Sequence, residues 1–171
     1  MLSVILLEGC TDQNNSGPKL VTVPLNTLGF KSNELPDDVV KQNETYNDTE
    51  IFVEFPPDKT VIFLEVYRVE YGLSEMEIYL TLDMKKLNST DVAKEQFERE
   101  KNDLLSSNFE IATDQEIGDD SVGVKLRDQY IIIFRKYNVL STIYPFTADD
   151  SSLQDFIDYA NIILNHIESS V

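Results

Sequence analysis

Apolar and polar residues alternate over residues 75–84, EMEIYLTLDM, and no other stretch constrains the fold as strongly. Successive side chains of a β-strand point to opposite faces of a sheet, so a period of two predicts a strand with one buried and one solvated face. The buried face would be made by every second residue, namely Met76, Ile78, Leu80, Leu82 and Met84. These residues therefore give the clearest strand signal in the chain.

Two further strands are predicted just before this one. Residues 50–55 and 60–71 are rich in the β-branched and aromatic residues that strands favour, and Pro56-Pro57 separates them. Gly72-Leu73-Ser74 would then join the second of these strands to residues 75–84 as a hairpin.

The residues before position 50 carry weaker signals. Residues 19–25 alternate loosely and are expected to form a first strand, with Pro24 marking its end or the edge of the sheet. Residues 26–50 are rich in Asn, Asp and Glu, and we expect a long surface excursion with one helical turn after Pro36.

The final third of the chain is again rich in predicted strands. Residues 108–117 and 121–126 would form two of them. Residues 130–135 and 139–144 are expected to be the two arms of a hairpin that turns at residues 136–138.

Two segments change to the period of a helix. Residues 89–107 place Ala93, Phe97 and Leu104 on one stripe, and Ser89 or one of the two residues after it can cap the helix. Residues 151–170 carry the stronger pattern, with apolar residues at helical spacing at Leu153, Phe156, Ile157, Ala160, Ile163, Leu164 and Ile167. This second helix is expected to lie flat on a sheet face.

The order of these elements predicts an α+β fold. Runs of adjacent strands with few helices imply a mainly antiparallel sheet of about six to eight strands, on which the mid-chain helix and the C-terminal helix pack. We expect residues 19–171 to form one domain. Residues 1–18 would be a truncated signal and lipobox segment followed by a flexible tether.

Residues 117–146, with the helices before and after them, resemble the second half of Mog1/PsbP-like domains and related prokaryotic lipoproteins. In such sequences a Gly-Asp-x-Ser turn leads into a strand, and a Phe-Arg-Lys-Gly-Asn hairpin precedes a C-terminal helix. Gly118-Asp119-Asp120-Ser121 and Phe134-Arg135-Lys136-Tyr137-Asn138 match this pattern, except that Tyr137 replaces the turn glycine. The hairpin type must then differ, or Asn138 must carry the positive φ. The resemblance implies an α/β sandwich that serves as a binding or assembly module.

The N-terminal residues Leu7-Glu8-Gly9-Cys10 follow a short apolar run and resemble the lipobox of secreted lipoproteins. In that family the cysteine becomes the lipidated first residue of the mature chain. Glu8 stands where Ala or Ser is usual, and the apolar run is short and lacks a basic segment, which a start codon further upstream would explain. The alternative is a frayed terminus or first strand in which Cys10 is a small buried hydrophobe.

Four Asn-x-Ser/Thr sequons offer independent support for export. They lie at Asn14, Asn43, Asn47 and Asn88, mostly in segments that we expect to be loops. Because glycans need exposed acceptors, these positions permit glycosylation.

The charge balance excludes some partners. The chain has 31 acidic and 14 basic residues, a net charge of −17. Nucleic-acid binding depends on Lys and Arg that neutralise phosphates, so we expect no nucleic-acid partner, and contact with a membrane only through the lipid. Cationic ligands, metal ions and basic partners remain open, as does the simpler interpretation that the charge keeps the protein soluble.

The sequence carries no catalytic motif. His166 is the single histidine and Cys10 the single cysteine, so neither has the neighbours that a zinc site or a triad needs. Calcium-loop spacing, Gly-x-Ser-x-Gly and phosphate-binding loops are also missing. We therefore expect no catalytic residue, no metal ion and no cofactor.

Arg68 and Arg135 each interrupt an apolar strand. If they share a sheet face, they could line a carboxylate or anion pocket among Tyr67, Tyr79 and Tyr130. The simpler interpretation is that each arginine extends to solvent and pairs with a nearby glutamate.

These observations favour an exported, non-enzymatic protein that is anchored through Cys10 to the outer face of the cytoplasmic membrane and binds a partner protein or small ligand. One alternative is a hydrolytic enzyme that uses two close carboxylates with separated pKa values in a deep cleft. A second alternative is a cytoplasmic adaptor without a lipid anchor.

Overall fold

The computed structural model describes residues 17–55, 59–74, 77–113, 115–126, 129–145 and 153–171. Its elements are a 3₁₀ turn η1 (Leu25–Thr27), the strands β1 (Val40–Asn47), β2 (Ile51–Phe55), β3 (Lys59–Ser74), β4 (Glu77–Leu87), β5 (Glu110–Thr113), β6 (Asp120–Leu126), β7 (Gln129–Lys136) and β8 (Val139–Pro145), and the helices α1 (Thr90–Ser106) and α2 (Leu153–Glu168). The eight strands form one antiparallel sheet in the order β1-β3-β4-β8-β7-β6-β5, and β2 pairs with the first part of β3. The predicted α+β class is confirmed.

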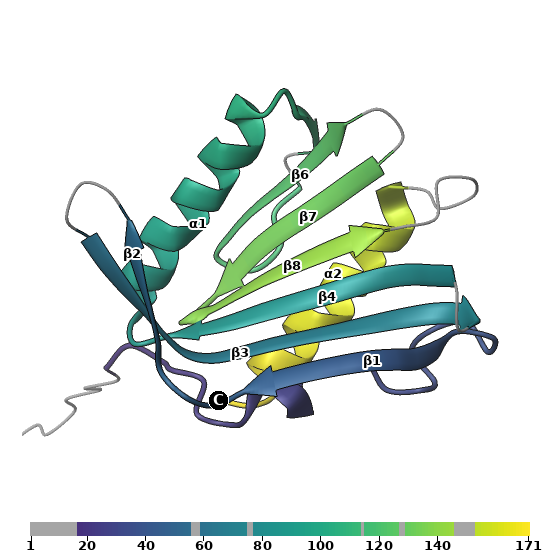
Figure 1. The fold of residues 1–171 in the computed structure, drawn as a ribbon, viewed down its shortest axis with the longest axis horizontal. Helices are drawn as coiled ribbons and strands as arrows, with labels where there is room; N and C mark the ends of the chain where they lie inside the picture. Colours follow the sequence, from purple (N-terminus) through teal and green to yellow (C-terminus); the bar gives the residue numbers. More distant parts are fainter. Residues whose placement is uncertain (1–16, 56–58, 75–76, 114, 127–128, 146–152) are drawn as a thin grey trace, which may run out of the picture.

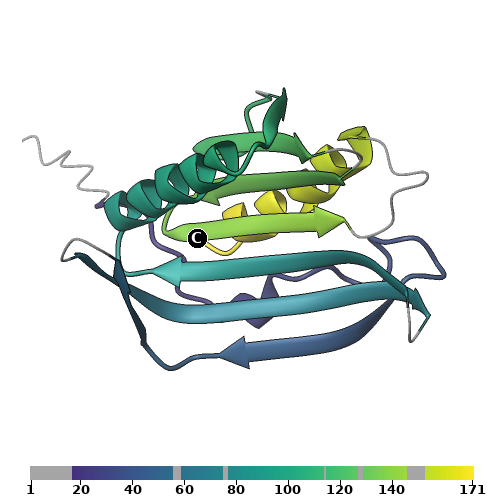
Figure 2. The same cartoon turned by 45° about the horizontal axis from the view of Figure 1, so that its top comes forward.

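The two helices cover opposite faces of this sheet, as Figures 1 and 2 show. On the α1 face, Ala93 and Phe97 pack against a cluster that includes Ile133. On the α2 face, buried residues of the helix pack against β7 and β8 in a second cluster. Because both faces are covered, β7 has an unbroken apolar run, in which Ile133 faces α1 while its neighbours Ile132 and Phe134 face α2.

The predicted buried face of β4 is confirmed, since Leu80, Leu82 and Met84 are fully buried in the α2-side cluster. The opposite face was predicted to be solvated, which is wrong: Thr81 on that face is fully buried as well. The predicted hairpin between β3 and β4 also forms. However, Gly72 and Ser74 pair with β4 as part of the extended β3 and do not form the connection. Residues 75–76 lie outside the described ones.

The predicted strand at residues 19–25 is wrong. This segment lies across the α2 face and ends in η1 instead of pairing with a strand. Its backbone bonds to side chains, with the amide of Val21 donating to Asn138 Oδ1 (2.7 Å) and the amide of Leu25 donating to Glu65 Oε2 (2.8 Å). The composition of residues 19–25 is typical of a strand, but it does not decide the structure here. Side chains, and not a neighbouring strand, accept the hydrogen bonds of the backbone amides.

The predicted surface excursion at residues 26–50 is also partly wrong, because β1 occupies its second half. The region after Pro36 holds a single hydrogen-bonded turn, with the amide of Val39 donating to the Pro36 carbonyl (2.9 Å). The sequence does not predict β1 because β1 is an edge strand with mostly exposed side chains. It therefore lacks an alternation of apolar and polar residues.

The β7–β8 hairpin turns at Tyr137 and Asn138, as expected from the sequence, but the positive φ (55°) belongs to Tyr137 and not to Asn138. The backbone of Tyr137 is held on both sides: its amide donates to Asp119 Oδ2 (2.8 Å), and its carbonyl accepts from Arg135 (2.8 Å). Asn138 is buried, and its side-chain amide bridges Val21 and Leu87.

Candidate functional site

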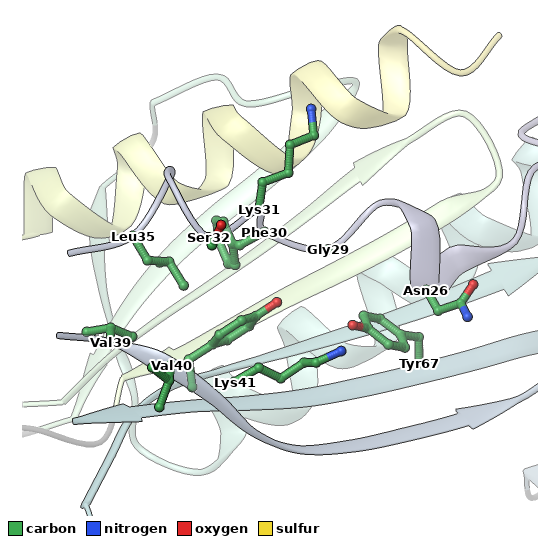
Figure 3. A pocket seen from close by; sticks show the side chains of 11 residues that line it. Asn26, Gly29, Phe30, Lys31, Ser32, Leu35, Val39, Val40, Lys41 and Tyr67 are labelled. Atoms are coloured by element: carbon green, nitrogen blue, oxygen red, sulfur yellow. The ribbon is translucent and has the colours of Figure 1, made fainter. Parts of the chain in front are cut away.

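The candidate site is a cavity of about 290 Å³ on the α2 side of the sheet, called here the tyrosine cavity (Figure 3). Its upper wall is the segment of residues 26–35, and its floor is formed by β3 together with the start of β1. The lining residues are Asn26, Gly29, Phe30, Lys31, Ser32, Leu35, Val39, Val40, Lys41, Tyr67 and Tyr71.

The upper wall of the tyrosine cavity is held in place by apolar residues within it and at its two ends. Leu28 and Leu35 of the wall, and Leu25 and Val39 beside it, are all buried in the α2-side cluster. These four side chains fix the segment against the sheet although it forms no strand.

A histidine of α2, His166, also attaches this wall to the helix. The two ring nitrogens of His166 lie 3.1 Å from the carbonyl oxygen of Leu28 and 2.9 Å from Glu34 Oε1. Glu34 in turn accepts from the backbone amide of Lys31 (2.7 Å). Burial opposes ionisation of Glu34, but these hydrogen bonds outweigh it and lower the pKa of its carboxyl. His166 therefore links α2 to the wall of the tyrosine cavity, and the sequence did not indicate these two partners.

Two phenols and a carboxylate come together at the floor of the tyrosine cavity. Tyr67 and Tyr71 lie on the same face of β3. Glu44 in β1 pairs with Val69, which lies between the two tyrosines in β3, so Glu44 shares this face. The negative charge of Glu44 therefore acts on both hydroxyls.

Burial dominates the acid–base properties of these tyrosines. It raises the pKa of Tyr71 to about 12, and it raises the pKa of Tyr67 further, helped by the nearby Tyr71 and Glu44. Both side chains are nearly inaccessible to solvent, at 2% and 3% exposure. The two phenols are therefore neutral hydrogen-bonding groups at physiological pH.

Gly29 lies directly above these hydroxyls. A Cβ at this position would stand 3.0 Å from the Tyr67 hydroxyl and 3.3 Å from that of Tyr71. The absence of a side chain at Gly29 thus lets the wall approach the floor closely.

The predicted pair of arginines is placed by the structure on one face of the sheet, the α1 face, with β4 and β8 between their strands. Arg68 pairs with Asp83 (3.4 Å) and Glu70 (3.6 Å). Tyr67 lies on the other face, in the α2-side cluster. The ligand-binding role of Arg68 and Arg135 stays a prediction.

Arg135 instead connects the two motifs that resemble Mog1/PsbP-like domains, residues 118–121 and 134–138. Its Nε donates to Asp120 (2.6 Å) and its Nη1 to Asp119 (3.2 Å). Lys136 bonds to Asp119 (3.2 Å) and to Glu168 at the end of α2 (2.8 Å). Burial opposes ionisation of Asp119, but the Tyr137 amide and the Lys136 ammonium outweigh it and lower its pKa.

The predicted modification sites have different settings. Cys10 and Asn14 lie outside the described residues. Asn43 and Asn47 lie in β1 and not in a loop, whereas Asn88 is exposed between β4 and α1. Whether any of them is modified stays a prediction.

The alternative of a hydrolase requires two close carboxylates with separated pKa values, so the carboxylates outside the tyrosine cavity are relevant to it. Burial raises the pKa of Asp83, on the α1-side face, although Arg68 nearby opposes the shift. A second cavity of about 350 Å³ near the start of β6 is lined by Glu98, Glu116, Asp119 and Asp120 among others. Among the described residues, no group of three His, Cys, Asp or Glu side chains is arranged to hold a metal ion.

The fold and the cavity define this chain as an α+β domain with a two-sided antiparallel sheet and a tyrosine-floored pocket. Comparisons with protein-family models, curated proteins and solved structures found no match. The resemblance to Mog1/PsbP-like domains therefore stays a prediction. Within the described part of the chain, no helix has the length and apolar character needed to cross a membrane.

Proposed function

We propose that this protein is an exported, non-enzymatic binding module, anchored through a lipid on Cys10, and that its tyrosine cavity binds a small ligand. The tyrosine cavity is the observation that carries this proposal, since it combines apolar walls with a few fixed polar groups, as small-molecule sites do. A preorganised site of this kind loses little entropy when a ligand binds.

Fragment binding tests the use of the cavity. We expect some members of a library of small aromatic compounds to bind, as detected by ligand-observed NMR. Ser32 lines the cavity and is exposed, so Ser32→Phe should block binding with little effect on folding. Asn33→Phe adds the same ring at the next exposed residue and should leave binding intact. Binding that survives Ser32→Phe, or a screen without hits, would contradict the proposal.

Mass spectrometry tests the anchor separately. The full reading frame, including any upstream segment, should yield a membrane-bound chain that begins at Cys10 and carries the added mass of a lipid. The Cys10→Ser variant should lack this mass and leave the membrane fraction. An unmodified wild-type chain in the cytosol would support the adaptor alternative.

A further inference from the structure

We infer that the tyrosine cavity selects a small organic carboxylate, whose apolar body packs against Phe30 and Val39 and whose carboxylate binds Lys41. This inference rests on the proposed function and specifies the chemical class of the ligand.

The first argument is the charge of the lining. Two lysines, Lys31 and Lys41, line the tyrosine cavity, and no Asp or Glu does. In a chain with 31 acidic and 14 basic residues, a lining that contains lysines and no acid departs from the composition, although Glu44 pairs with Lys41 (2.9 Å) and Glu34 with Lys31 (4.0 Å) beside the cavity. The cavity near β6 differs, since four acids and one lysine, Lys101, line it. An anionic ligand is thus better accommodated in the tyrosine cavity than in the cavity near β6.

The second argument is the direction of Lys41. Figure 3 shows its ammonium pointing along the floor toward Tyr67, whereas the side chain of Lys31 extends away toward α2. Lys41 donates to Glu44 (2.9 Å), which uses one of its three N–H groups. With its side chain 52% exposed, Lys41 retains donors for a second carboxylate.

The third argument concerns the remaining polar groups on the floor. Burial raises the pKa of Tyr67 and of Tyr71, so both hydroxyls are neutral at physiological pH and bring no positive charge to a ligand. The charged donor of the floor is Lys41, which fixes the end of the cavity at which the carboxylate binds.

The fourth argument is size. About 290 Å³ lies at the lower end of the range for small-molecule sites, enough for one ring with a short side chain. Phe30, Leu35 and Val39 give this space apolar walls, so a monocyclic acid fits better than an inorganic anion.

Three probes of the same shape test the inference with the full-length chain. Phenylacetate, phenylacetamide and phenethylamine share a ring and a short arm but carry negative, zero and positive charge. In NMR titrations of the labelled protein we expect phenylacetate to shift the amides of Phe30, Lys41 and Tyr71, and to bind about fivefold more tightly than phenylacetamide. Phenethylamine should bind most weakly.

Lysine variants locate the charge effect. Lys41→Gln should abolish the preference for phenylacetate over phenylacetamide, whereas Lys31→Gln should reduce it less than twofold, and Lys94→Gln on α1 should leave it unchanged. Equal losses for Lys41→Gln and Lys31→Gln would overturn the assignment of the carboxylate to Lys41.

The outcomes separate the inference from the proposed function. Equal affinities for phenylacetate and phenylacetamide, blocked by Ser32→Phe, would overturn the charge selection while the binding role stands. If none of the three probes shifts a cavity residue, the carboxylate class is wrong. If the wider fragment screen also fails, the proposed function is wrong as well.

Discussion

The imidazole of His166 on α2 lies 2.9 Å from the carboxylate of Glu34, which belongs to the wall of the tyrosine cavity. Its other ring nitrogen faces the carbonyl oxygen of Leu28 at 3.1 Å. Both partner oxygens can accept a hydrogen bond from the ring. The C-terminal helix thus holds the wall of the tyrosine cavity through one side chain.

Replacing Glu34 tests this attachment. Glu34→Gln should lower the free energy of unfolding at neutral pH by about 1 kcal/mol and increase hydrogen exchange of amides in residues 28–34. The pKa of Glu34 is lowered in the folded protein, so its contribution is present above its unfolded pKa and is lost as the pH falls through the folded value. The difference between wild type and variant should therefore shrink below about pH 4. A difference that persists undiminished at pH 3 would contradict a stabilising role of the ionised Glu34 carboxylate.

Gly118 begins the turn that contacts Arg135. Its φ is +74°, and a Cβ would stand 2.5 Å from the carbonyl oxygen of Arg135. We expect Gly118→Ala to destabilise the protein by about 2–3 kcal/mol in chemical denaturation, because both the backbone conformation and the contact become unfavourable. Gly17 has no neighbouring atom within 4 Å, so Gly17→Ala is the matched control and should change stability by less than about 0.5 kcal/mol. Equal effects of the two substitutions would refute this account of the turn.

The ion pair between Lys86 and Glu65 is mostly buried, with side-chain exposures of 5% and 16%. Lys86 also donates to the Val23 carbonyl (2.6 Å), and Glu65 accepts from the Leu25 amide. Lys86→Met should cost about 3 kcal/mol, because it leaves the carboxylate of Glu65 buried without its counter-ion.

Lys85→Met is the control for this substitution, since the Lys85–Glu100 pair is more exposed, at 28% and 17%. It should cost less than about 1 kcal/mol in the same denaturation experiment. Hydrogen exchange at Leu25 should accelerate in the Lys86 variant only. If the two variants lose the same stability, burial does not set the strength of these pairs.

Alkaline titration tests the burial of the tyrosines. Of the eight tyrosines in the chain, burial raises the pKa of five, namely Tyr46, Tyr67, Tyr71, Tyr144 and Tyr159. A tyrosine whose pKa is higher in the folded state stabilises the fold below its unfolded pKa near 10 and loses this contribution as the pH rises. Absorbance at 295 nm should therefore show these five tyrosines ionising only well above pH 10, as circular dichroism reports unfolding. Ionisation of all eight near pH 10 in a folded protein would contradict the prediction.

Much of the fold could be predicted because its elements carry local patterns. β4 has a period of two, and α2 has apolar residues at helical spacing, five of which are buried. Ser89 caps α1 by accepting from the Val92 amide (3.2 Å), as the residue type suggested. These features depend on neighbours close in the sequence, so they are visible without the tertiary structure.

The candidate site was largely hidden. Lys41 lies in an edge strand without an apolar pattern, and Tyr71 reads as one more aromatic residue of a strand. The segment of residues 26–35 reads as a polar loop, although the spacing of its buried leucines was a signal that could have marked it as packed. Tyr67 was named as a pocket residue, but beside arginines that lie on the other face of the sheet.

The sequence by itself determined both helices and the strands with a clear apolar pattern, such as β4 and β7, because periodicity is a property of adjacent residues. It did not determine β1 or the course of residues 19–25. Only the tertiary structure decided where the 17–39 segment packs, since Asn138, Glu65 and His166 bond to it from distant parts of the chain. It also decided that Tyr137 takes the positive φ, because Asp119 and Arg135 hold its amide and carbonyl. The tyrosine cavity arises in the same way, from packing between residues that no local pattern connects.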